Sequence, residues 1–289
     1  MALNLSTFKT RSITAALFVA VMLAGLLINH WTYFLLFTFI HFGCWMEYQK
    51  LIALIDKDYK LISPFHRYGI MLAGWCIMLY FTNNDFRFGD FFLHPVGWWL
   101  ALLLAFLLPI TELLFSSTIL PKNIGYSAGG ILYISLSCGF MVDLLLFPSL
   151  PYMSTPLMPL VIIGCMWIND TMAYIVGSLI GKTPLSAISP KKTWEGTVGG
   201  IILCVTVVAI ASYYIPILRD IHFIHWLSIS TISAVAGTLG DLLESKLKRL
   251  AGVKDSGSIM PGHGGFLDRF DSLLVAAPFV WLYVEVFLR

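Results

Sequence analysis

The chain has 289 residues and a formal net charge of +2, with 58% hydrophobic and only 12% charged residues. Soluble proteins average roughly 45–50% apolar and about 25% charged residues. No soluble core can bury so large a share of apolar side chains. The composition and the mean hydropathy of +0.83 therefore exclude an ordinary soluble globular protein and indicate a membrane protein.

Nine apolar runs follow one another along the sequence, near residues 12–30, 31–46, 69–82, 97–115, 126–147, 157–181, 197–218, 225–243 and 271–288. Several approach the ~20 residues that a helix needs to cross about 30 Å of hydrocarbon. The shorter runs at 31–46 and 69–82 are expected to be tilted, extended or re-entrant. Since a helix pairs its own backbone groups in lipid, we predict an all-α polytopic membrane protein with roughly nine transmembrane helices.

The first run follows Lys9 and Arg11, as the apolar part of a signal peptide would. It is followed by Asn29, His30 and Trp31 rather than by a small-residue cleavage site, so we expect a retained first span. The five cysteines all fall within apolar runs and form no CxxC pair. They are expected to act as small apolar residues, without a zinc site or a disulfide framework.

The basic residues predict the orientation of the chain. With the N-terminus inside and nine alternating spans, 15 of the 18 Lys and Arg residues fall on the inner side, several of them in a charged, solvated connection at 47–67. Only Arg87, Arg219 and Arg289 fall outside. A bias of this size follows the positive-inside rule and predicts a cytoplasmic N-terminus. The polar segments of the second half then also face the cytoplasm.

A first polar group interrupts the run at 157–181. Asp170 lies near its middle, where a charge is costly, so we expect it to face the bundle interior or a wet cavity. The alternative is a cluster of hydrogen bonds between helices. Gly177 and Gly181 precede Lys182, but three residues separate these glycines where a phosphate-binding P-loop needs four. The two glycines are better interpreted as a face for close helix packing.

A second polar group occupies residues 189–196, which read SPKKTWEG. Ser189 and Pro190 indicate a turn, and an apolar helix is expected to begin shortly after it. The free N–H groups and the positive dipole end of a helix N-terminus suit a phosphate, and Lys192 and Thr193 add a charge and a hydroxyl. The alternative is a positively charged membrane anchor followed by a helix cap.

A third polar group lies between Asp241 and Asp271, where 31 residues hold ten of the 34 formal charges. If the run at 225–243 continues as a helix, its polar residues at positions 241, 245, 248 and 249 share one face. Asp268 and Asp271, three residues apart, also share a face if the last helix begins there. A glycine-rich turn at 261–265 separates the two helices. Hard cations such as Mg²⁺ bind carboxylates together with substrate phosphates, so Asp241 and Asp268 are candidates to hold a metal from both sides of this turn.

These segments resemble the phosphatidate cytidylyltransferases, also called CDP-diacylglycerol synthases. The resemblance rests on three motifs in order: D-T-x-A-Y from Asp170, then G-K and S-P-x-K-T-x-E-G, then S-x-x-K-R, K-D and P-G-H-G-G-x-x-D-R-x-D ending at Asp271. They cover roughly residues 167–271. Asn169 and Met172 stand where members often have a small residue and a glycine, so the packing of that helix can differ.

The resemblance implies that CTP and phosphatidate react to give CDP-diacylglycerol and pyrophosphate, a step of phospholipid biosynthesis. It implies Mg²⁺ or another divalent cation, with room for a second cation, and a homodimer. We expect an integral protein of the bacterial inner membrane, in contact with membrane lipids, with its active site facing the cytoplasm. No nucleic-acid partner is expected. Residues 1–156 would form N-terminal scaffold helices, and residues 157–289 the catalytic region of one integrated membrane domain.

The resemblance also assigns site residues. The catalytic residues are expected to be Asp241, Ser245, Lys248, Arg249 and Asp268. The metal ligands are expected among Asp241, Asp268 and Asp271, with the motif favouring Asp268 over Asp271. Substrates are expected to contact Asp170, Lys182, Ser189, Lys192, Thr193, Glu195, His263 and Arg269. Asp170 is either a polar wall or a second metal ligand.

Two other functions stay open at this point. A CTP-dependent lipid kinase would use similar metal and phosphate chemistry, but it would transfer the terminal phosphate and release CDP. A transporter would also explain an acid in the middle of a span and helices interrupted by glycine. The sequence shows no inverted repeat, and its polar groups gather on the cytoplasmic side rather than at the midplane.

Overall fold

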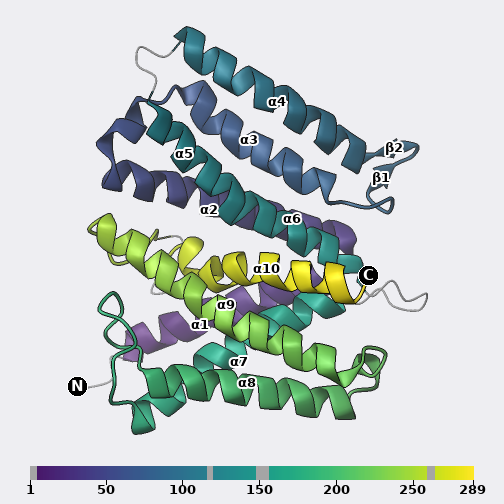
Figure 1. The fold of residues 1–289 in the computed structure, drawn as a ribbon, viewed down its shortest axis with the longest axis vertical. Helices are drawn as coiled ribbons and strands as arrows, with labels where there is room; N and C mark the ends of the chain where they lie inside the picture. Colours follow the sequence, from purple (N-terminus) through teal and green to yellow (C-terminus); the bar gives the residue numbers. More distant parts are fainter. Residues whose placement is uncertain (1–4, 116–119, 148–155, 259–263) are drawn as a thin grey trace. The chain divides into compact units, whose positions relative to one another are not determined.

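The structure is a computed structural model that describes residues 5–115, 120–147, 156–258 and 264–289 (Figure 1). The chain divides into two compact units, which are described separately. The first unit comprises Met1–Pro156 and Leu247–Phe270, and the second comprises Leu157–Lys246 and Asp271–Arg289. In the described residues the regular structure is helical, apart from one antiparallel hairpin of β1 (Arg87–Phe88) and β2 (Phe91–Phe92).

The first unit consists mainly of α-helices linked by short turns. Its elements are α1 (Leu5–Leu27), α2 (His30–Ile55), η1 (Lys57–Leu61), α3 (Pro64–Tyr80), α4 (Leu93–Phe115), α5 (Pro121–Gly130), η2 (Ile131–Ser135), α6 (Leu136–Asp143) and η3 (Leu144–Leu146). The side chains of Asn29 and Ser63 cap α2 and α3 by accepting hydrogen bonds from backbone N–H groups of the first turn. These caps determine where the two helices begin.

The second unit consists of α7 (Leu157–Ile180), α8 (Trp194–Tyr214), the short η4 (Pro216–Leu218), and most of α9 (Phe223–Leu250) and α10 (Leu267–Phe287). The C-terminal end of α9 and the N-terminal end of α10 belong to the first unit. The two helices thus enter both units along the chain.

Each of the nine predicted apolar runs overlaps one or more helical elements. Six helical stretches of the described chain are long and apolar enough to cross a membrane, at Leu93–Phe115, Pro121–Asp143, Leu157–Ile180, Trp194–Tyr214, Phe223–Leu250 and Leu267–Phe287. A shorter apolar helix lies at Ser12–Leu27. The chain is therefore an all-helical polytopic membrane protein, as predicted, while the count of nine spans stays a prediction.

The prediction of a solvated connection at 47–67 is wrong for its first part. Helix α2 continues to Ile55, and Glu47 and Gln49 are 7% and 2% exposed. The predicted run ended at the first charged residue, because an unpaired charge is costly to bury. Here the Gln49 amide donates to the carbonyl of Arg67 at 2.8 Å. Glu47 also accepts hydrogen bonds, which are described with the site.

The core of the first unit is organised around α2. The Trp45 indole donates to the Ser135 hydroxyl at 2.9 Å, and His41 Nε2 lies 3.0 Å from the same oxygen. Gly130 leaves room for the Trp45 ring, which a Cβ at that position would meet. The π-helical turn η2 begins directly after this contact. Such turns occur as local bulges that accommodate an irregular contact.

Small residues bring the helices of the second unit together. A Cβ on Gly196 would lie 2.7 Å from the Ala173 carbonyl oxygen, and one on Gly200 would lie 2.9 Å from the Asn169 carbonyl oxygen. Gly177 lies opposite Gly196, which agrees with its interpretation as a packing residue. Helices in lipid commonly approach each other closely through such positions. All five cysteines of the chain are buried, which agrees with their expected role as small apolar residues.

This packing predicts that Gly200→Ala destabilises the protein. The added methyl group would overlap the α7 backbone, so the free energy of unfolding should fall by about 1–3 kcal/mol, the usual cost of overpacking. Gly164→Ala is the matched control, since a Cβ there meets no atom within 4 Å. The free energy of unfolding of both variants can be measured on the purified proteins in mixed micelles. Equal stability of the two variants would contradict the packing argument.

Candidate active site

Three carboxylates meet in the second unit. One carboxylate oxygen from each of Asp241 and Glu244 on α9 and Asp271 on α10 lies within 4.8 Å of the other two. Glu244 and Asp271 are 0% and 8% exposed, and Asp241 is partly exposed. Charges of one sign at such separations repel each other strongly when buried. A bound cation would relieve this repulsion.

Close packing of α9 and α10 produces this cluster. A Cβ on Gly240 would collide with the backbone carbonyl of Asp271, and one on Gly237 would meet the Met166 sulfur and the Ser272 side chain. Asp241 and Glu244 are three residues apart and share the face of α9. The backbone N–H of Ser272 donates to the Asp271 carboxylate at 2.7 Å. The backbone thus determines where the three side chains meet.

A basic residue from the loop between α7 and α8 reaches this acidic cluster. Lys192 forms an ion pair with Asp241. The charges of Asp170 on α7 and of Lys192 also act on the Asp271 carboxyl group. The structure therefore brings together four predicted site residues, from three of the polar segments identified in the sequence. Their individual roles stay predictions.

The loop between α7 and α8 is held by its own hydrogen bonds. The Thr193 hydroxyl accepts from the Gly196 N–H at 3.1 Å and caps α8. The Glu195 carboxylate accepts from the backbone of Lys182 at 3.2 Å and from the Thr183 hydroxyl at 2.8 Å. The helix cap proposed as an alternative for this segment is therefore present. It leaves the Lys192 side chain directed at the acids.

The remaining predicted residues of this loop are more open. The Ser189 carbonyl accepts a hydrogen bond from the Lys192 N–H at 3.0 Å, which closes a tight turn. Ser189 is partly exposed and Lys182 is exposed. Gly181 ends the region of close packing against Thr193, and the preceding residues are helical. A P-loop would follow a strand, so the helical context agrees with the rejection of that motif.

Asp268 belongs to a cluster of polar groups in the first unit. One of its oxygens accepts from Lys248 at 2.6 Å. The other accepts from the Ser256 N–H at 2.9 Å and the Gly265 N–H at 2.8 Å, and it also lies 2.9 Å from the Ser256 hydroxyl oxygen. Gly264 has a φ of +82°, a conformation that favours glycine. In this arrangement Asp268 organises the turn that leads into α10, and its predicted role as a metal ligand stays a prediction.

Glu47 of α2 joins the same cluster, and the sequence prediction missed it. Its carboxylate accepts from the Ser256 hydroxyl at 2.7 Å, the Phe266 N–H at 3.0 Å and the Leu267 N–H at 2.9 Å. An anion is stabilised at the N-terminus of a helix, here α10. Gly43, one turn earlier on α2, leaves room for the Phe266 ring. In the sequence, the only feature that pointed to Glu47 was its position at the end of an apolar run, four residues after Gly43.

Glu244 is the second residue that the sequence prediction missed. It follows Asp241 by three residues, and this spacing alone places both acids on one face of a helix. The predicted continuation of the helix beyond residue 243 is correct, since α9 ends at Leu250. Ser245 is partly exposed, and the Arg249 side chain donates to the Val253 carbonyl at 3.5 Å. Arg269 is exposed, and His263 lies outside the described residues.

The acidic cluster fits a divalent cation by its chemistry. Mg²⁺ prefers oxygen ligands, and it commonly uses one or two carboxylates together with substrate phosphates. Asp241, Glu244 and Asp271 offer three carboxylates in a partly buried position. Asp241 is also paired with Lys192, so a cation would have to share or displace that lysine. The cluster can therefore hold a metal next to a basic group.

Part of the chain is similar to known proteins named phosphatidate cytidylyltransferase. The phosphatidate cytidylyltransferase of Bacillus subtilis (strain 168) is 46% identical over 122 residues, which is 42% of this chain and 45% of that protein. The corresponding protein of Synechocystis sp. is 41% identical over 129 residues, 43% of this chain and 42% of that protein. Phosphatidate cytidylyltransferase 4 of Arabidopsis thaliana chloroplasts is 40% identical over 121 residues, 42% of this chain and 30% of that protein.

The chain spans less than half the length of these curated relatives in the matched region. The sequence profile of the cytidylyltransferase family, in contrast, matches residues 9–287, nearly the whole chain. This match includes the loop that carries Lys192 and the helices that carry the acidic cluster. The chain belongs to the cytidylyltransferase family.

Proposed function

We propose that the protein transfers the cytidylyl group of CTP to phosphatidate, giving CDP-diacylglycerol and pyrophosphate. The observation that carries this proposal is the cluster of Asp241, Glu244 and Asp271, with Lys192 against it. Such a cluster suits a reaction between two negatively charged phosphates. The family match and the relatives named phosphatidate cytidylyltransferase support the choice of substrates.

The reaction would proceed in one displacement. An oxygen of the lipid phosphate attacks the α-phosphorus of CTP, and the bond from that phosphorus to the bridging oxygen of the β-phosphate breaks. Pyrophosphate leaves with the bonding electron pair. Catalysis of such a transfer depends mainly on positioning and on charge neutralisation. No protein nucleophile is needed.

The residues of the chain would bind and orient the two phosphates. Asp241, Glu244 and Asp271 would hold Mg²⁺, which supplies charge neutralisation at the phosphoryl oxygens. Lys192 would release Asp241 and pair with a substrate phosphate instead. Lys248 and Arg249 would also bind substrate phosphates. Asp170, near the metal cluster, would be a polar wall or a ligand of a second cation.

The proposal also includes the arrangement in the membrane. We propose nine transmembrane helices with a cytoplasmic N-terminus, in a bacterial inner membrane. The bias of the basic residues supports this orientation. CTP then meets the site from the cytoplasm, while phosphatidate reaches it through the bilayer. A homodimer is proposed from the resemblance alone.

The proposed reaction can be tested by following the label of CTP. With CTP labelled at the α-phosphate, purified protein, Mg²⁺ and phosphatidate should give a labelled lipid and free pyrophosphate. Removal of Mg²⁺ with EDTA should abolish the transfer, since the phosphate charges are then not neutralised. If a label in the γ-phosphate enters a lipid and CDP is released, the protein is a lipid kinase and the proposal is wrong.

The metal role of the acidic cluster predicts a second result. Glu244→Gln and Asp271→Asn should each raise the Mg²⁺ concentration for half-maximal rate by about tenfold or more, because each removes a charged ligand. Without metal, the same substitutions should raise the melting temperature, because a repelling charge is lost. Glu285→Gln is the control, since Glu285 is far along α10 and pairs with Arg289. Unchanged Mg²⁺ dependence in both variants would disprove the metal role.

Glu47 is proposed as a positioning residue for the turn before α10. Its three partners are all donors, so Glu47→Gln would direct an amide N–H toward a donor and lose one or two hydrogen bonds. We expect kcat to fall by about tenfold, with smaller changes in KM for CTP. Lys50→Gln, an exposed change on the same helix, is the control. A change in KM alone, or equal losses in both variants, would rule out this role.

A further inference from the structure

A cavity of about 500 Å³ lies within the first unit, between α3, α4 and the stretch of α5 and η2. Its walls are mainly apolar and include Ile70, Leu108, Ile131 and Leu132. Pockets that bind small organic molecules commonly measure roughly 300–1,000 Å³. The cavity is formed by residues that have no part in the proposed cytidylyl transfer.

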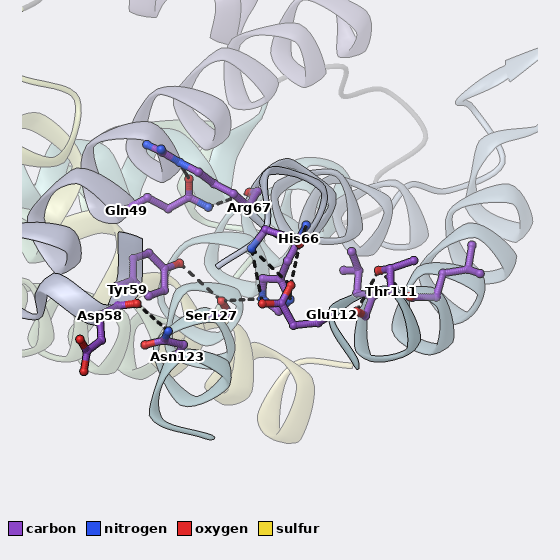
Figure 2. A network of polar contacts seen from close by, with 12 residues as sticks. Gln49, Asp58, Tyr59, His66, Arg67, Thr111, Glu112, Asn123 and Ser127 are labelled. Carbon is purple, nitrogen blue, oxygen red and sulfur yellow. Dashed lines mark hydrogen bonds and ion pairs between the residues drawn. The ribbon is translucent and has the colours of Figure 1, made fainter. Parts of the chain in front are cut away.

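One end of this cavity is polar (Figure 2). His66, Glu112 and Ser127 line it and are 5%, 7% and 1% exposed. The Ser63 hydroxyl donates to Glu112 Oε2 at 2.6 Å, and His66 Nε2 lies 3.0 Å from the Ser127 hydroxyl oxygen. A buried carboxylate and a buried imidazole in an apolar wall are costly unless they are paired. Glu112 is paired with Ser63 in this way, and among the described residues it is the second nitrogen of His66 that still lacks a hydrogen-bond partner.

At this polar end His66 and Glu112 approach each other without a direct hydrogen bond. His66 Nδ1 has no hydrogen-bond partner among the described residues and lies 3.9 Å from Glu112 Oε2. That separation is too long for a hydrogen bond. A single oxygen placed beside both atoms could accept from the imidazole N–H and donate to the carboxylate. With the imidazole proton on Nδ1 and the Ser127 hydroxyl donating to Nε2, a group that both donates and accepts, such as a hydroxyl, satisfies the two partners.

The charges at this end of the cavity also restrict the charge that a ligand can carry. The carboxylate of Glu112 would repel a phosphate or a fatty-acid carboxylate, and no Lys or Arg lines the cavity. A pure hydrocarbon would leave His66 Nδ1 without a partner. We propose that the cavity binds a neutral lipid with a free hydroxyl group, such as a fatty alcohol. Its alkyl chain would fill the cavity, with the hydroxyl between His66 and Glu112.

The cavity is accessible from the side of the bundle. Leu113 and Leu132 line it and are 65% and 63% exposed, so an alkyl chain can enter past them from lipid. Pro109 within α4 has no N–H to donate to the carbonyl of Ala105, and both residues line the cavity. The helix is therefore less tightly held at this point.

The polar end is held in place by the turn η1. Lys122 pairs with Asp56 at 2.9 Å and with Asp58 at 2.7 Å, and the hydrogen bond from Lys122 lowers the pKa of the Asp56 carboxyl. The Asn123 amide donates to the Asp58 carbonyl at 2.9 Å (Figure 2). The Tyr59 hydroxyl lies 3.4 Å from the Ser127 hydroxyl. The hydroxyl site is thus part of an ordered network.

The test uses the full-length protein in nanodiscs of phosphatidylcholine and a photoreactive hexadecanol. Mass spectrometry should locate the label on α3, α4 and α5. Unlabelled hexadecanol should compete at least about tenfold better than hexadecane or hexadecanoate, because only the alcohol forms both hydrogen bonds without a charge clash. In Glu112→Gln the advantage of the alcohol over hexadecanoate should shrink about tenfold, since the repelling charge is gone.

Two tryptophan variants separate this site from general contact with lipid. Ala105→Trp places an indole in the cavity and should abolish the competed labelling. Leu103→Trp, at an exposed position of α4 outside the cavity lining, should leave it unchanged. Equal competition by all three compounds, labelling that survives Ala105→Trp, or protection of the cavity by a second copy of the chain would overturn the proposal. Each readout is independent of cytidylyl transfer.

Discussion

Burial of carboxylates in an apolar helical protein is the constraint on which the sites of this structure depend. Glu47, Glu112, Glu244 and Asp271 are all less than about a tenth exposed. A carboxylate moved out of water is costly unless donors or cations compensate it. Each site therefore consists of an acid together with what stabilises it. Glu47 accepts three hydrogen bonds, whereas the oxygens of Glu244 lie close to two further acids.

Close helix contact is the second condition, and small residues provide it. The meeting of Asp241 and Asp271 requires the absence of a side chain at Gly240, because a Cβ there would collide with the α10 backbone. Gly43 has the same function for α2 and Phe266, next to Glu47. In both places the glycine lies within one helical turn of the acid that it serves. Because glycine has no side chain, the helices approach closely at these positions. The glycines thus determine where charged side chains from two elements can meet.

The sequence predicts the helical membrane architecture well, because apolar runs of sufficient length have few alternatives in lipid. It also identifies Lys192, Asp241 and Asp271, whose segments the structure brings together. It fails at Glu47 and Glu244. At Glu47, a charged residue at the edge of an apolar run looks like the beginning of a loop, and only its tertiary contacts with Ser256 and Phe266 show otherwise. The periodicity of a sequence predicts which residues share a face of a helix, but it does not predict which other element packs against that face.

The contrast between Glu47 and Glu244 distinguishes structural from chemical acids. The carboxylate of Glu47 is surrounded by donors from Ser256, Phe266 and Leu267, so it is satisfied without any ligand. Glu244 lies within 4.8 Å of two other acids, an arrangement that costs stability in the absence of a cation. Buried charges that repel each other persist where they serve a ligand. The same reasoning applies to Glu112, since its neighbour His66 has no hydrogen-bond partner at Nδ1 in the described part of the chain. It distinguishes these two sites from the turn that Glu47 holds.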